Sequence, residues 1–66
     1  MNKPISLSQK SRILDFLSKN NIASEEGVWK RMDELDSGTA SDIIEAFYKR
    51  NNAIAIKQLQ HLKIIV

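Results

Sequence analysis

The sequence has no cysteine and a single histidine among its 66 residues. Without cysteine it forms neither a disulfide nor a thiolate metal site. His61 has no carboxylate at helical spacing, so we predict no metal site and no cofactor. Assembling a nucleophile with its base would need a second histidine or a cysteine. We therefore predict no catalytic residues and no enzymatic activity.

Long apolar runs are also missing. No stretch approaches the ~20 apolar residues that span a bilayer, and residues 1–6 lack the apolar run of a secretory signal. We expect a cytoplasmic protein with no membrane contact. A chain of this length forms one domain at most, here residues 1–66, with little room for a pocket of the usual ~300 Å³. No small-molecule substrate is therefore predicted.

The net charge of +2 is unevenly distributed, with basic ends and an acidic middle. Residues 51–66 carry Lys57 and Lys63 and no acid, whereas residues 25–36 carry five acids and two bases. A strong nucleic-acid binder usually shows a denser basic stripe. Nucleic-acid binding stays open as an alternative function, through the basic C-terminus and helix-1 region. The candidate contacts in the first twenty residues are Lys3, Lys10, Arg12 and Lys19.

Apolar spacing and capping residues predict an all-α bundle of three to four short helices. Ser6 and Gln9 match a capping box that opens a helix over 7–19. A second helix is predicted over 25–35, with Ser24 as its N-cap. The chain then divides into an N-terminal arm (1–5), a three-helix core (6–50) and an apolar C-terminal segment (53–66). The predicted core centre is Leu14, Leu17, Val28, Met32, Leu35, Ile43, Ile44, Phe47 and Leu59.

The stretch 36–44 predicts the boundary between the second and third helices. Ser37 and Gly38 form the predicted turn, and Thr39 is the predicted N-cap. A stripe of apolar residues follows, with a favourable ion pair between Glu45 and Lys49 on the outer face. The members of that stripe are Ala40, Ile43, Ile44 and Phe47.

Three side chains allow two interpretations each. Lys10 lies near the middle of the first apolar face, so it either meets a partner's anion or lays its stem on the core edge with its ammonium in water. Trp29 is either an interface anchor or a core residue. Tyr48 lies at the rim of the third helix, as an edge residue or as a stacking surface for a base.

The most unusual feature is the apolar surplus after Asn52, where four isoleucines and Val66 occur. We predict a helix from 53 to about 63 followed by an extended apolar tail. Exposed apolar patches mark interaction sites, so this segment is the predicted partner surface. The alternative is that the tail folds back under the first helix and completes the core. The candidate partner-binding residues are Ile54, Ile56, Lys57, Lys63, Ile64 and Val66.

The pattern over residues 6–50 resembles small helical modules of phage and plasmid proteins of DNA metabolism. In those modules a "Ser/Thr-x-x-Gln…Leu…Leu" helix is followed by "Leu-Thr/Ser-x-x-Glu-Ala-Ser-x-Leu-Ile". Thr39 replaces the usual glutamate. The resemblance implies a mobile-element context and supplies no catalytic residue. The matching positions are Gln9, Ile13, Leu17 and Leu35, then Ala40, Ser41, Ile43 and Ile44.

These observations predict a non-enzymatic interaction module that binds a protein partner, or a second copy of itself, through its C-terminal segment. The second and third helices also fit a helix-turn-helix. However, the outward face of the third helix carries Asp42 and Glu45, which would repel phosphates.

Overall fold

The computed structural model describes residues 3–22 and 26–65 and folds them into helices. The helices are α1 (Leu7–Lys19), α2 (Glu26–Arg31), the 3₁₀ turn η1 (Met32–Glu34), α3 (Ser37–Tyr48) and α4 (Asn52–His61). In this part of the chain the only β-pairing is an isolated bridge between Pro4 and Asp36. The predicted all-α fold is confirmed, and none of these helices has the length and apolarity to cross a membrane.

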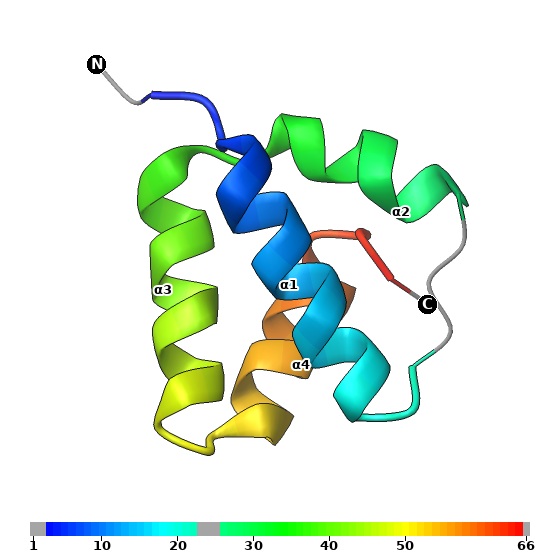
Figure 1. Ribbon diagram of the computed structural model, residues 1–66, viewed down its shortest axis with the longest axis vertical. Helices are drawn as coiled ribbons and strands as arrows, with labels where there is room; N and C mark the ends of the chain where they lie inside the picture. Colours follow the sequence, from blue (N-terminus) through cyan, green and yellow to red (C-terminus); the bar gives the residue numbers. More distant parts are fainter. Residues whose placement is uncertain (1–2, 23–25, 66) are drawn as a thin grey trace.

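The helix α3 lies between α1 and α4 and packs against both. The short helix α2 crosses one end of the bundle, next to the N-terminal arm (Figure 1). That arm is fastened by two backbone hydrogen bonds: the Ile5 N–H donates to the Leu35 carbonyl at 3.2 Å, and the Ser37 N–H donates to the Lys3 carbonyl at 2.7 Å. The start of α1 and the start of α3 are thereby held side by side.

The first helix begins and ends where its sequence predicts. The Ser6 side chain accepts from the Gln9 N–H, and the Gln9 side chain accepts from the Ser6 N–H, which completes the capping box. At the other end Asn21 has a positive φ of 60°. The Ile22 N–H then donates to the Leu17 carbonyl at 2.9 Å, as in a Schellman motif.

The second predicted helix, over 25–35, is divided in the structure. Residues 26–31 are α-helical and residues 32–34 form a 3₁₀ turn. Residues 24 and 25, which include the predicted N-cap Ser24, lie outside the described part of the chain.

The predicted start of α3 is wrong by three residues. Asp36 is the N-cap, and its carboxylate accepts from the Thr39 N–H at 2.7 Å. Thr39 therefore lies inside the helix, and Ser37 and Gly38 form its first turn rather than a loop. Asp36 becomes the cap because the bridge to Pro4 holds it extended, with φ −89° and ψ 166°.

The core draws on every helix and on both ends of the chain. Of the predicted centre, Leu14 and Ile44 are only partly buried, while the other seven residues are buried. Six further residues are buried outside the predicted centre: three flank the helices, two are alanines within α3 and α4, and one is an isoleucine within α1. These are Ile5, Ile13, Ala40, Ala55, Ile64 and Ile65.

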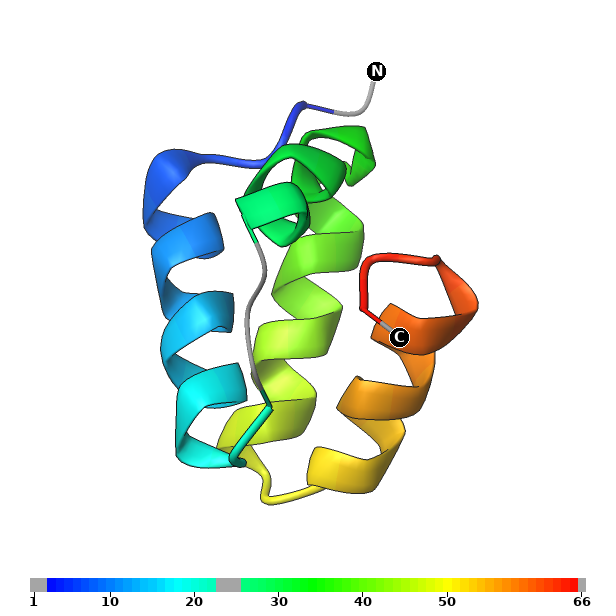
Figure 2. The same ribbon diagram turned by 90° about the vertical axis from the view of Figure 1, so that its right-hand side faces the viewer.

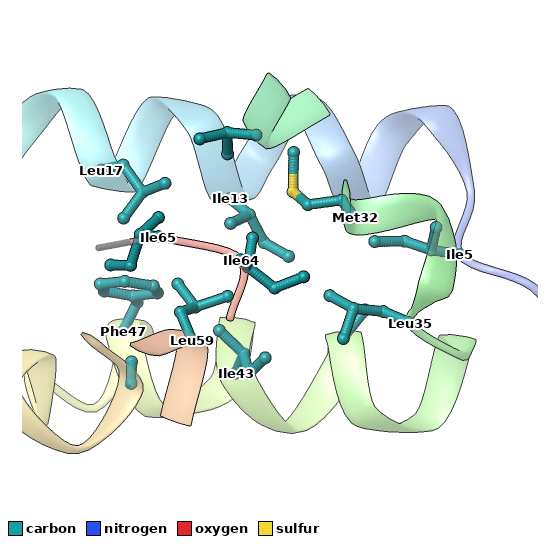
Figure 3. Close-up of a cluster of buried hydrophobic side chains, with 13 residues drawn as sticks. Ile5, Ile13, Leu17, Met32, Leu35, Ile43, Phe47, Leu59, Ile64 and Ile65 are labelled. Atoms are coloured by element: carbon teal, nitrogen blue, oxygen red, sulfur yellow. The ribbon is translucent and has the colours of Figure 1, made fainter. Parts of the chain in front are cut away.

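The C-terminal tail returns to the core, as the alternative interpretation proposed. The Ile64 N–H donates to the Leu59 carbonyl at 2.9 Å after Lys63, whose φ is 62°. This Schellman turn reverses the chain at the end of α4. Ile64 (1% exposed) and Ile65 (7% exposed) then point into the cluster that contains Leu17, Phe47 and Leu59 (Figure 3).

Candidate functional site

A groove on the solvent side of α1 extends to the end of α3. Its volume is about 710 Å³, and it adjoins a smaller hollow of about 340 Å³ with which it shares Ser8, Arg12 and Tyr48. The α1 residues lining it recur at helical spacing, because positions four and seven apart share one helix face. Ser8, Arg12, Asp15 and Lys19 follow this spacing, and Leu7, Ser11, Phe16 and Tyr48 complete the lining.

Aromatic rings form one wall of the groove and connect it to the core. Phe47 is buried, and its ring stacks on Phe16 with 4.8 Å between centroids and 5° between planes. Phe16 and Tyr48 pack edge to face, with 5.3 Å between centroids and 87° between planes. Tyr48 itself is 58% exposed. The series therefore passes from the interior to solvent, and its outermost ring faces the groove.

Two cations lie against these rings. Arg12 donates a hydrogen bond to the Tyr48 hydroxyl, and its guanidinium carbon lies 5.8 Å from the centre of that ring. The Lys19 ammonium lies 5.8 Å from the centre of Phe16, and it also pairs with Asp15 at 3.1 Å. The groove thus combines cationic, aromatic and hydroxyl groups, which are the chemistry of phosphate and base contacts.

The predicted C-terminal partner surface is only partly retained in the fold. Ile64 is buried, so its prediction as a partner contact is wrong: the turn at Lys63 carries it inward. Ile56 is half-buried against the core. Ile54 remains 61% exposed, and Lys57 and Lys63 are exposed as well. Val66 lies outside the described residues.

The four nucleic-acid contacts predicted in the first twenty residues differ in their exposure and in their position relative to the groove. Arg12 and Lys19 are exposed and line the groove. Lys3 is exposed on the N-terminal arm and does not line it. Lys10 is only 5% exposed, so its prediction as a nucleic-acid contact is wrong.

Neither of the two interpretations proposed for Lys10 describes its position in the structure. Its ammonium is withdrawn from water, pairs with Asp33 and lies 4.9 Å from the centre of the Trp29 ring. It joins α1 to the α2–η1 segment from within the same chain. Trp29 is half-buried at the edge of the core, between its two predicted roles. No local spacing signals this contact, because Lys10 and Asp33 meet only in the folded chain.

Gln9 makes contacts that sequence reasoning missed. Beyond the capping box, its side-chain amide nitrogen donates to the Ser37 carbonyl at 3.1 Å and to the Ser41 hydroxyl at 3.1 Å. It therefore ties the first turn of α1 to the first turn of α3 at the end of the smaller hollow.

Two ionisable groups of α3 have shifted pKa values. Hydrogen bonds from the Thr39 side chain and backbone N–H lower the pKa of Asp36. The hydrogen bond to Glu45, with its charge, raises the pKa of Lys49, and these two side chains form the predicted ion pair at 2.9 Å. Both shifts belong to helix capping and pairing. Among the described residues no three side chains with metal-ligating groups come together.

Comparison with protein families, curated proteins and solved structures finds no match to this chain. The geometry of the groove is therefore the basis for a functional proposal.

Proposed function

We propose that this protein is a small, non-enzymatic module that binds nucleic acid through the groove along α1. The observation that carries the proposal is that Arg12, Lys19 and Tyr48 line one shallow, open groove. Arg12 and Lys19 are seven residues apart, so they lie on one face about 10 Å apart along the helix. Guanidinium and ammonium groups are the protein's usual phosphate ligands.

The charge balance in the groove favours weak binding. Asp15 pairs with Lys19, and on α3 Glu45 pairs with Lys49. Two phosphate contacts release few counterions, so the logarithm of the binding constant should fall with the logarithm of salt concentration at a slope of about −1.4 to −1.8. Affinity at physiological salt should lie near the weak end of non-specific binding, on the order of 10⁻⁴ M.

Fluorescence anisotropy of labelled oligonucleotides over a range of salt concentrations tests this proposal. Arg12→Gln together with Lys19→Gln should abolish the salt-dependent binding. Lys57→Gln together with Lys63→Gln is the matched control, because it removes two exposed positive charges that lie outside the groove. Absence of binding at low salt, or an equal loss in the control, would contradict the proposal.

A protein partner on α4 is the second candidate. Ile54 and Leu62 are exposed, by 61% and 36%, beside Lys57 and Lys63. Residues 51–66 carry no acidic side chain. The lysines would repel a second copy of the same face, so the complementary partner is an acidic amphipathic helix. Two partly exposed side chains supply far less than the ~800 Å² per partner of a stable interface, so this candidate ranks second.

Titration with an acidic amphipathic peptide would decide on the second candidate. Binding that Ile54→Asn abolishes and Arg12→Gln preserves would support it. Peptide binding that is unchanged in Ile54→Asn would exclude this face of α4. The cytoplasmic location, the mobile-element context and the absence of enzymatic activity remain proposals from the sequence.

A further inference from the structure

The Tyr48 ring is exposed to solvent yet fixed in orientation. Phe16 packs against it edge to face, at 5.3 Å and 87°, and Phe16 is itself stacked on buried Phe47. Arg12 holds the hydroxyl at the other end of the ring. A ring fixed in this way loses little conformational freedom when a ligand lies on it, and pre-organisation of that kind favours binding.

Arg12 has capacity for a second contact. A guanidinium carries five N–H donors, so the bond to Tyr48 leaves others directed to the groove. The ring and the guanidinium are adjacent, with 5.8 Å between the guanidinium carbon and the ring centre. A base lying on the ring would thus have its own phosphate within reach of Arg12.

Resting on the function proposed above, we infer that Tyr48 is a stacking surface for an unpaired base, and that the groove takes single-stranded nucleic acid. Aromatic side chains bind single strands because every unpaired base presents a free face, whereas the bases of a duplex are already stacked on each other. Tyr48 stacks the base, Arg12 contacts the adjacent phosphate, and Lys19 lies further along the same groove.

The surroundings of the groove disfavour a duplex. Reading a duplex commonly places a protruding helix in the major groove. Here the cations line a hollow, and Asp15 lies between Arg12 and Lys19 on the exposed face of α1. The neighbouring exposed face of α3 carries Asp42 and Glu45, which would meet the second strand's phosphates.

The test compares Tyr48→Leu and Tyr48→Phe with the unaltered chain on three probes: single-stranded oligothymidylate, the same backbone without bases, and a DNA hairpin duplex. Tyr48→Leu should weaken oligothymidylate binding about 5- to 100-fold, because it removes the ring that stacks. Tyr48→Phe should weaken binding less than Tyr48→Leu does, because it keeps the ring and loses only the hydroxyl that Arg12 holds. The base-free backbone should bind both variants and the unaltered chain equally. Thermal unfolding of each variant verifies the fold, which an exposed side chain should leave intact.

The possible results distinguish a failure of the stacking inference from a failure of the proposed function. Equal binding of oligothymidylate by Tyr48→Leu and the unaltered chain, or duplex binding as tight as single-strand binding, would overturn the stacking role while leaving phosphate binding in place. If no probe binds at low salt, the proposed function fails and the inference fails with it.

Discussion

At the scale of single residues, Gln9 shows how one side chain serves both local and long-range structure. Its side-chain oxygen accepts from the Ser6 N–H at 3.0 Å, which closes the capping box of α1. Its nitrogen donates to the Ser37 carbonyl and the Ser41 hydroxyl on α3. The first contact follows from a spacing of three residues, whereas the second depends on the packing of α1 against α3.

Replacing the Gln9 amide with a carboxylate disrupts the contact to α3 while keeping the capping-box contact. Gln9→Glu keeps an oxygen for the Ser6 N–H but places a second oxygen against the Ser37 carbonyl. We expect the free energy of unfolding to fall by about 1–3 kcal/mol, measured by urea denaturation. Ser11→Glu is the control, because it adds the same charge on an exposed position of α1. An equal effect of both substitutions would contradict this role.

The ion pair of Lys10 predicts an asymmetry between its two partners. Asp33→Ala leaves a buried ammonium beside Trp29 without its carboxylate, at a cost of about 1–3 kcal/mol. Lys10→Met removes the charge while retaining most of the stem's volume, and should cost less, because an apolar replacement needs no partner. Urea denaturation of both variants and of the double variant checks this. The double variant should match Lys10→Met; equal losses in the two single variants would contradict it.

At the scale of secondary structure, each of the three longer helices ends in the same way. Asn21, Arg50 and Lys63 follow α1, α3 and α4 with φ values of 60°, 62° and 62°. Asparagine tolerates this left-handed conformation better than most residues, so the end of α1 at Asn21 is recognisable from the sequence. Arginine and lysine carry no such signal, so the two later turns were not predicted. The second of these turns directs Ile64 into the core.

The cap of α3 predicts a dependence of stability on pH. Asp36 has a pKa below its ordinary value of 3.8 because it accepts hydrogen bonds from Thr39. Since the folded-state pKa is the lower one, the unfolded chain binds the proton first as pH falls. This contribution to stability is therefore complete above about pH 5 and is lost as pH falls through the lowered pKa.

Asp36→Asn tests that dependence, because asparagine also caps helices but does not titrate. The difference in free energy of unfolding between the natural chain and this variant should be constant above about pH 5 and should shrink below it. Chemical denaturation at a series of pH values measures the difference. If this difference stayed constant down to acid pH, the charge of Asp36 would contribute nothing to the stability of the folded chain.

At the scale of the whole molecule, the C-terminal tail is part of the fold. Ile64 and Ile65 are buried among side chains from α1, α3 and α4. The Arg31 side chain also donates to the Ile64 carbonyl at 3.0 Å, which joins the tail to α2. A domain of this size has only about 3–10 kcal/mol of stability. Burial of the two tail isoleucines therefore contributes a large share of the free energy of unfolding.

Replacing either of two isoleucines near this end with alanine should have very different effects on the free energy of unfolding. Ile64→Ala empties a fully buried site and should cost about 2–5 kcal/mol, enough to unfold much of the protein. Ile54→Ala changes a side chain that is 61% exposed, and should stay within about 0.5 kcal/mol. Thermal unfolding of the two variants makes the comparison. Similar melting temperatures would show that the tail lies outside the core.

Much of the helical pattern could be predicted because its determinants are local. The span of α1 follows from a capping box three residues long, an apolar repeat and an asparagine exit. The pair between Glu45 and Lys49 follows from a spacing of four residues. The candidate groove could not be predicted in the same way. Arg12 and Tyr48 are thirty-six residues apart, and nothing in either segment specifies the other.

The amino-acid sequence alone determined that the chain is helical, where α1 lies, and which faces of the helices are apolar, because capping and amphipathic spacing act between near neighbours. Only the tertiary structure decided that Ile64 faces inward, that Lys10 meets Asp33, and that Arg12 meets Tyr48. Those contacts depend on the directions in which the helices leave their turns and on which side chains fill the small core. No single stretch of the sequence determines either.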